Sequence, residues 1–334
     1  MSDIRAPAKR LWIGVAVAIV LLLTVAAILL WRSGRTGAND DKVTLTVGDQ
    51  RGGVQSLLQA AGELDNLPYH VEWALFPAAS PLLEALNSHA VDIGGIGGAP
   101  FAFAYASGAP IKVVFATRQI SGHGSRASAI IVPANSPIHS WADLKGKRLA
   151  TVRGSAGQDL ALSLFERHGL APNDVKWIYL NNSEAKAALD TGSADAWSTW
   201  SGYVGFALLK DHARAFADGR ELPAQAAFYA ANEKAIASKR AQIADFVQRI
   251  ARARKWALTH KREYAAVLSS ETGLPLDVAQ FVVNELEMQA VPIDKSIEQE
   301  QQHILERYRK AGVIDKVPSL AGAFDPSFNL PVVH

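Results

Sequence analysis

Landmark residues of this chain recur at a nearly constant separation, and this repetition constrains the fold more than any other feature of the sequence. A shift of 103 positions relates Phe103-Ala104 to Phe206-Ala207, Ser80 to Ser183, Leu86 to Leu189 and Asp92 to Asp195. With slightly different shifts, Arg51-Gly52 meets Arg153-Gly154, and Val71-Glu72-Trp73 meets Val175-Lys176-Trp177. Because these landmarks keep the same order in both copies, the sequence predicts two copies of one structural unit.

Each copy alternates short β-rich runs with helical runs. Residues 42–50 alternate as a strand, and the helical run that follows carries apolar residues at Val54, Leu57, Leu58 and Ala61. This alternation favours an α/β fold with duplicated Rossmann-like lobes. Ligands of open α/β sheets bind beyond the carboxyl ends of the strands, so two such lobes predict a cleft between paired loops. The pairs are 49–53 with 153–157, 76–80 with 181–183, and 97–100 with 197–203.

The most conspicuous of these loops carries four glycines, Gly94, Gly95, Gly97 and Gly98. Pro100 stands where the dinucleotide fingerprint needs its third glycine, and no Gly-Lys-Ser/Thr follows, so neither nucleotide motif is present. Pro100 instead suits the first turn of a helix capped by Gly98 or Ala99. The glycines either let a ligand approach the backbone closely or serve tight packing at the strand end.

The equivalent loop of the second copy offers aromatic rings instead, from Trp197, Trp200 and Tyr203. Each tryptophan is also compatible with ordinary core packing. Helix N-termini carry unsatisfied N–H groups and about half a positive charge. Amides on one side and rings on the other therefore predict a site for a small ligand with an anionic head and an apolar body.

Composition narrows the function classes. The 334 residues carry a net charge of +2 with scattered basic residues, which gives no indication of a nucleic-acid partner. The absence of cysteine excludes disulfides, thiolate metal sites and cysteine nucleophiles. The nine histidines show no metal-ligand spacing, and no G-x-S-x-G elbow accompanies the Gly122–Ser125 stretch. We therefore expect no enzyme activity, no metal and no cofactor.

Residues 1–38 form a separate N-terminal region, a membrane anchor or signal sequence with its linker. An uncharged apolar run, Leu11–Trp31, follows Arg10 and precedes Arg32. Its length suffices to cross a hydrocarbon core of about 30 Å. The sequence favours an uncleaved anchor over a long signal peptide cleaved after Thr36-Gly37-Ala38. Either interpretation predicts that the remainder is exported.

Three segments, residues 71–116, 129–155 and 193–203, resemble the periplasmic aliphatic-sulfonate-binding proteins of ABC importers and their taurine- and nitrate-binding relatives. The likeness extends from Lys42 to the C-terminal tail. It implies a two-lobed periplasmic-binding-protein type II fold whose cleft closes on the ligand. The chain would cross between lobes near residues 121–132 and 224–233. These crossings predict a first lobe of residues 42–122 plus 226–334 and a second lobe of residues 123–225.

Two departures from the family bear on the ligand. Family members commonly have an acidic residue where this chain has Gly98-Ala99-Pro100, and they often have Trp-Asp-Pro where it has Trp200-Ser201-Gly202. Without these two carboxylates the cleft suits an anion that has no amino group, which counts against taurine. A bulky or aromatic sulfonate fits this expectation.

The candidate ligand-binding residues come from the paired loops and from arginines near them. The candidate charge partners are Arg51, Arg118, Arg126 and Arg153. The full predicted site comprises Gln50, Arg51, Gly52, Phe76, Gly97, Gly98, Ala99, Arg118, Arg153, Ser155, Ala156, Gly157, Trp200 and Ser201.

The C-terminal part of the chain predicts two further helices, of which the first is basic. Residues 239–268 have apolar positions at Ile243, Phe246, Val247, Ile250 and Trp256. They predict one amphipathic helix on the first lobe, with its charged face in solvent. Residues 296–312 predict a second helix, ended by Gly312.

These observations predict a monomeric periplasmic solute-binding protein, tethered to the inner membrane by Leu11–Trp31. It would bind a sulfonate-like anion and deliver it to an ABC permease and its ATPase. Two alternatives stay open: a nitrate-, taurine- or other small-ligand-binding protein of the same family, and a membrane-tethered sensor domain without transport.

Overall fold

The computed structural model describes residues 42–51 and 53–330. The predicted span Leu11–Trp31, its linker and Gly52 lie outside these residues. Within the described part of the chain, no helix is both long enough and apolar enough to cross a membrane. The residues from Thr44 onward form one compact unit.

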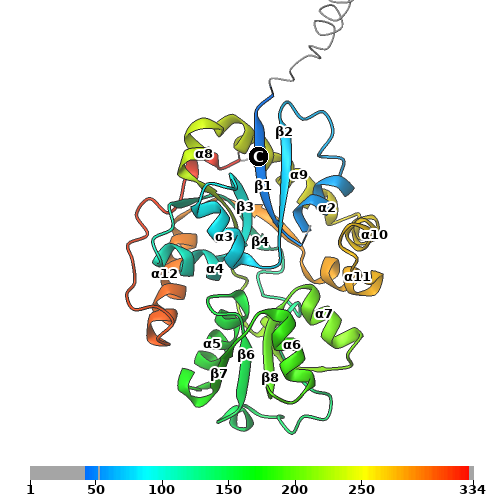
Figure 1. Cartoon of the computed structure of the whole chain (residues 1–334), viewed down its shortest axis with the longest axis vertical. Coiled ribbons are helices and arrows are strands. Elements are labelled where there is room, and N and C mark those ends of the chain that lie inside the picture. The colour runs from blue at the N-terminus through cyan, green and yellow to red at the C-terminus, as the bar shows by residue number, and fades with distance from the viewer. Residues whose placement is uncertain (1–41, 52, 331–334) are drawn as a thin grey trace, which may run out of the picture. The chain divides into compact units, whose positions relative to one another are not determined.

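Two β-sheets organise this unit (Figure 1). The first has the strand order β11-β4-β10-β3-β1-β2 and the second β7-β6-β8-β5-β9. The strands of the first sheet are β1 (Thr44–Gln50), β2 (His70–Phe76), β3 (Ile93–Gly97), β4 (Ile111–Gln119), β10 (Ala227–Asn232) and β11 (Met288–Val291). Those of the second are β5 (Ser128–Val132), β6 (Arg148–Thr151), β7 (Lys176–Tyr179), β8 (Ala196–Trp200) and β9 (Arg214–Asp218).

Helices cover both sheets. The helices that precede β5 in the chain are α2 (Gly53–Ala60), α3 (Ala79–Asn87) and α4 (Gly98–Ala106). The second sheet carries α5 (Ala156–His168), α6 (Asn182–Asp190) and α7 (Gly202–Leu209). The C-terminal third adds α8 (Glu233–Ser238), α9 (Arg240–Ala257), α10 (Lys261–Thr272), α11 (Leu276–Glu285) and α12 (Lys295–Lys310). Short 3₁₀ helices span Trp141–Leu144, Pro172–Asp174, Gly219–Glu221 and Pro326–Phe328.

The predicted duplication is confirmed by the topology. The series β2-β1-β3-β10-β4 has the same arrangement as β7-β6-β8-β5-β9, and in each series the fourth strand runs antiparallel to both neighbours. The repeated aspartates make the same contact in each copy. Asp92 Oδ2 accepts a hydrogen bond from Thr46 N at 2.8 Å, and Asp195 Oδ2 accepts one from Arg148 N at 2.8 Å.

The chain passes from the first sheet to the second between β4 and β5, and returns between β9 and β10. We refer to each sheet with its helices as the first and second lobe; the exact boundaries at residues 122 and 225 stay a prediction. Two helices of the C-terminal third also reach the second lobe. Helix α11 packs on α7 and α12 packs on α5, on opposite sides of the junction in Figure 1.

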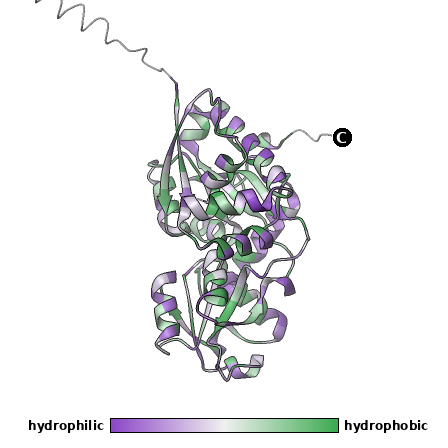
Figure 2. Cartoon of the chain, turned by 90° about the vertical axis from the view of Figure 1, so that its right-hand side faces the viewer, coloured by the Kyte–Doolittle hydropathy of each residue, from purple (hydrophilic) through white to green (hydrophobic). Residues whose placement is uncertain are grey.

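The cores follow from the apolar strands. In Figure 2 the strands are mostly hydrophobic, whereas the outer faces of the helices are hydrophilic. In the first lobe, the fully buried Phe101 packs against Phe228 at 5.5 Å and against Phe324 at 5.7 Å between ring centroids. In the second lobe, Phe165 is buried and packs edge-on against Trp141. Both lobes therefore have their own apolar interior.

The long basic helix expected over residues 239–268 is instead two helices, α9 and α10, which are separated at His260. The residues predicted to face the lobe do so, because Ile243, Phe246, Val247 and Ile250 are all buried. The expectation of a wholly solvated charged face is wrong at Arg254, whose side chain lines an internal cavity.

Candidate functional site

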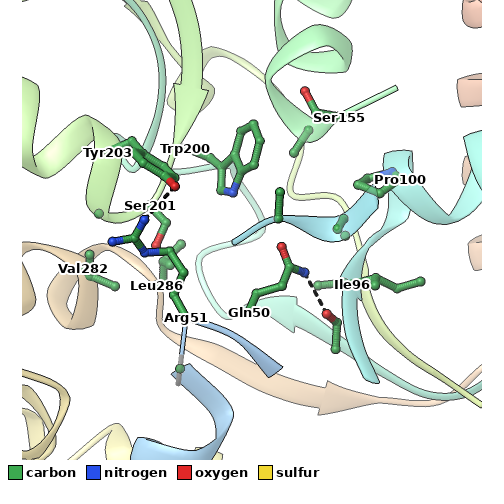
Figure 3. A pocket seen from close by; sticks show the side chains of 18 of the residues that line it. Gln50, Arg51, Ile96, Pro100, Ser155, Trp200, Ser201, Tyr203, Val282 and Leu286 are labelled. Atoms are coloured by element: carbon green, nitrogen blue, oxygen red, sulfur yellow. Dashed lines mark hydrogen bonds between the residues drawn. The ribbon is translucent and has the colours of Figure 1, made fainter. Parts of the chain in front are cut away.

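A cavity of about 570 Å³ lies between the two lobes. Pockets of ~300–1,000 Å³ are typical for organic ligands of drug size. All six segments of the predicted loop pairs contribute to its lining, and Figure 3 shows Gln50, Pro100, Ser155 and Trp200 around it. The predicted site residues that line the cavity are Gln50, Arg51, Gly97, Ser155, Ala156, Trp200 and Ser201.

Three helices begin at the cavity wall without a side-chain cap. The N-cap residues Ala78 of α3, Gly97 of α4 and Ser201 of α7 make no side-chain hydrogen bond to the first turn, and all three line the cavity. By contrast, the α5 N-terminus is capped by Ser155, whose side chain accepts a hydrogen bond from Gln158 N. Uncapped first-turn N–H groups need an acceptor, so their convergence creates an environment for an anion.

The charged residues around the cavity also favour an anionic ligand. Its described lining includes the cations Arg51, Lys186 and Arg254 but only one carboxylate, Asp49. Lys186 is paired with Asp190 and Asp211. The Asp49 carboxylate caps α2 by accepting hydrogen bonds from the backbone N–H groups at Val54 and Gln55. Burial raises the pKa of Asp49, although these amides and Arg254 oppose the shift.

One contact joins the lobes across the cavity. Arg51 Nη1 donates to the Tyr203 hydroxyl at 2.7 Å, and the guanidinium carbon lies 5.0 Å from the centre of the Tyr203 ring (Figure 3). Trp200 packs edge-on against Tyr203 with 6.3 Å between ring centroids. On the floor, Gln50 Nε2 donates to Gly95 O at 2.8 Å. The aromatic loop of the second lobe thus faces the Arg51 turn of the first.

Two of the lining residues have unfavourable backbone conformations. Arg51 has φ = 58° and Ser201 has φ = 56°, although neither is glycine. Such positive φ values cost about 1–2 kcal/mol for an L-residue. Strain of this kind is often retained at functional sites, where the surrounding structure holds it in place.

Replacing Ser201 by glycine is expected to raise the free energy of unfolding by about 1 kcal/mol, because it relieves this strain. The Ser201 side chain caps nothing, so no hydrogen bond of the α7 N-terminus is lost. If the hydroxyl contacts the ligand, affinity falls at the same time. His212→Gly is the matched control, since His212 has φ = 54° but does not line the cavity. Denaturant unfolding and calorimetry of both variants measure the two effects; unchanged stability in Ser201→Gly would contradict the strain.

Several predicted site residues lie beside the cavity but do not line it. Gly98 and Ala99 are buried in the first turn of α4, where a Cβ on Gly98 would meet Gln301 and the Ala226 carbonyl. Gly157 is buried against β8. Phe76 packs on the core that contains Leu82. These residues lie behind the lining of the cavity and do not contact the cavity itself.

The other candidate arginines already have partners. Arg118 is 2.7 Å from Glu300, and Arg126 is 3.5 Å from Glu285. Arg153 donates to Val313 O at 3.2 Å and lies over the Tyr179 ring. None of the three lines the cavity. Ligand contact by the predicted residues stays a prediction.

Sequence reasoning missed the part of the cavity formed by the C-terminal third. The residues concerned are Arg254, Tyr264, Leu268, Thr272, Leu274, Val282, Val283, Leu286 and Met288, together with Tyr229 of β10. None of these residues lies in a loop pair predicted from the duplication, so the repeat did not indicate them. Within the described residues, no three His, Asp or Glu side chains gather closely enough to hold a metal ion.

Two lobes that share a five-strand arrangement around an anion-favouring cavity define a solute-binding protein of the periplasmic-binding-protein fold. Residues 75–264 match the profile of a family described as NMT1/THI5 like. A protein named as an aliphatic sulfonates-binding protein from Escherichia coli (strain K12) is 30% identical over 262 residues, which are 78% of this chain and 81% of that protein. The chain belongs to the NMT1/THI5-like family.

Solved structures with this fold include proteins of the same kind. The alkanesulfonate-binding protein SsuA from Xanthomonas axonopodis pv. citri, bound to MOPS, superposes with a TM-score of 0.77 at 25% identity, covering 84% of this chain and 98% of its own. The periplasmic aliphatic sulphonate binding protein SsuA from Escherichia coli gives a TM-score of 0.68 at 29% identity, covering 82% of this chain and 89% of its own.

Proposed function

We propose that this protein captures an organic sulfonate in the interlobe cavity and delivers it to the permease of an ABC importer. The observation that carries the proposal is the convergence of three uncapped helix N-termini on one cavity with a surplus of cationic residues. A sulfonate is a permanent anion with three acceptor oxygens, so it can accept hydrogen bonds from several backbone N–H groups at once.

The walls support an organic ligand rather than an inorganic anion. Trp200, Phe206, Leu274 and Leu286 line the cavity, and its volume of about 570 Å³ far exceeds the space that nitrate needs. Burial of the apolar body of a ligand strengthens the free energy of binding by about 25 cal/mol per Å² of apolar surface removed from water. The names of the sulfonate-binding relatives agree with this ligand class.

The cavity disfavours taurine, whose ammonium group needs a carboxylate. Asp49 is the one carboxylate among the described lining residues, and the N–H groups of Val54 and Gln55 already occupy its oxygens. A ligand without an amino group leaves no unpaired charge there. Substrates without an ammonium group should therefore bind more tightly than taurine.

We further propose that the protein is not an enzyme and acts in the periplasm, tethered through Leu11–Trp31. The chain has no cysteine, and the described cavity lining contains no histidine to act as a general base beside a serine. Mass spectrometry of the exported protein tests the tether. A mature N-terminus near Asn39 would show that the anchor is removed.

Isothermal titration calorimetry of the soluble part tests the ligand class directly. The panel comprises alkanesulfonates, benzenesulfonate, MOPS, taurine, nitrate and sulfate. We expect binding by the organic sulfonates and weaker or no binding by taurine and the two inorganic anions. Absence of heat with every sulfonate would refute the proposal.

Arg51→Ala and Trp200→Ala are each expected to weaken sulfonate binding by roughly ten- to hundredfold. The first removes a charge-assisted hydrogen-bond donor and the second removes aromatic wall surface. Arg126→Ala is the control, because Arg126 pairs with Glu285 and does not line the cavity. If both cavity variants bind like the control, the sulfonate occupies some other place.

A further inference from the structure

The cavity continues past the paired loops into an inner annex of the first lobe. We define this annex by Leu268 of α10, Leu274 just before α11, Val282 of α11, Leu286 just after it, and Met288 of β11. In Figure 3, Val282 and Leu286 lie on the Arg51 side, away from Ser155 and Pro100. The annex is apolar and adds length to the cavity beyond the loops that the duplication predicts.

Arg254 of α9 belongs to the same end of the cavity. It lines both the main cavity and a small adjoining pocket formed with Tyr264, Val283, Leu286 and Met288. Its Nε is buried and has no hydrogen-bond partner. No carboxylate of the described residues forms an ion pair with Arg254 within 4.0 Å, although other arginines of α9, such as Arg249 and Arg252, have such pairs.

The groups nearest Arg254 do not neutralise its charge. Burial raises the pKa values of Tyr229 and Tyr264, so both hydroxyls stay uncharged at physiological pH. Asp49 attracts the guanidinium at longer range, but its oxygens are held by the α2 backbone. The Tyr229 hydroxyl is a side-chain hydrogen-bond partner of Arg254, but this neutral group leaves the positive charge uncompensated and Nε without a partner. A guanidinium is always protonated and is costly to bury without a counter-charge. A cation placed this way at a cavity wall is suited to an anionic group of a ligand.

We infer that Arg254 is a second anchoring residue and that the ligand is a two-ended sulfonate. Its sulfonate lies at the interlobe helix N-termini, its apolar body occupies the annex, and a carboxylate or second sulfonate at its other end pairs with Arg254. This inference rests on the proposed function, since it specifies the substrate class of the same cavity.

Matched pairs of probes test the inference. Calorimetry compares benzenesulfonate with 4-sulfobenzoate, and each alkanesulfonate with the sulfocarboxylate of the same chain length. We expect the two-ended member of the best-fitting pair to bind wild-type protein roughly ten- to hundredfold more tightly, the usual gain from a charge-assisted hydrogen bond. In Arg254→Met this advantage is lost, whereas affinity for the one-ended sulfonates falls much less.

Arg249→Met is the matched control. Arg249 lies on the same helix and is largely buried, but it pairs with Asp245 and does not line the cavity. It should retain the full preference for two-ended sulfonates. Arg254→Lys keeps the charge and should retain part of that preference. Thermal unfolding of each variant shows whether the fold is intact.

The outcomes separate this inference from the proposed function. Equal binding of one-ended and two-ended sulfonates by wild-type protein would overturn the inference and leave the proposed function standing. An equal loss of both kinds in Arg254→Met would place the sulfonate itself at Arg254, which also overturns it. Binding of no sulfonate at all would instead overturn the proposed function.

Discussion

Replacing Arg307 by methionine is expected to lower the free energy of unfolding by about 3–5 kcal/mol, the usual cost of leaving one member of a buried ion pair alone. Arg307 Nη1 lies 2.6 Å from Asp159 Oδ1, and the Asp159 side chain is only 1% exposed. Its second oxygen accepts a hydrogen bond from Gln225 at 2.7 Å. Without Arg307, the Asp159 carboxylate keeps only this neutral donor.

The same substitution should also weaken ligand binding. Arg307 belongs to α12, which packs on α4 of the first lobe, whereas Asp159 belongs to α5 of the second. Next to this pair, the Tyr308 hydroxyl donates to Ser155 O at 3.2 Å, and Ser155 lines the cavity. Loss of the ion pair therefore loosens a connection between the lobes beside the site.

Denaturant unfolding measures the effect of Arg307→Met. Arg309 lies on the same helix and is exposed, so Arg309→Met serves as the control. It should change the free energy of unfolding by no more than about 0.5 kcal/mol. Adding Asp159→Asn to Arg307→Met should restore part of the stability, because no buried charge then remains. Wild-type stability in the single variant would mean that the pair contributes no net stabilisation.

Replacing Gly157 by alanine is expected to cost about 2–4 kcal/mol, from overpacking and the loss of a buried hydrogen bond. An added Cβ would lie 2.5 Å from Ser198 O and 3.0 Å from Thr151 Oγ1. Thr151 now donates to this carbonyl at 3.0 Å, and Ser198 Oγ donates to Gly157 O at 2.6 Å. The backbone of α5 must therefore move away from β8.

This movement reaches the cavity from both elements. Helix α5 follows Ser155 and β8 ends at Trp200, so sulfonate affinity should fall by at least about tenfold. Gly53→Ala is the control for stability, because nothing lies within 4 Å of its added Cβ. Chemical unfolding and calorimetry give the two readouts. A Gly157→Ala protein with unchanged values for both would contradict the proposed packing.

The architecture was predictable because duplication leaves a signal that does not depend on tertiary contacts. Asp92 and Asp195 stood 103 positions apart in the sequence, and the structure gives them equivalent bonds to the neighbouring strand. The break between α9 and α10 was less apparent, since apolar residues continue across it. No proline or glycine stands near His260 to mark the end of a helix.

The site was predictable where it depends on strand ends and not where it depends on long-range packing. Gln50, Gly97 and Trp200 end strands of the repeat and Ser155 follows one, and all four line the cavity. Arg254 gave no such signal, because a basic residue in an amphipathic helix usually faces solvent. Arg254 faces the cavity because α9 packs against α2 and β11, long-range contacts that the local sequence pattern does not show.

The cavity combines main-chain N–H groups with side-chain surfaces, and both lobes contribute to each. At the three uncapped helix N-termini the first-turn N–H groups belong to the main chain, so most side-chain substitutions leave them in place. The surfaces that would meet the body of the ligand are side chains, such as Trp200 and Leu286, which single mutations can replace. If the ligand binds as proposed, such a division would let the substrate range diverge while recognition of the anionic head persists.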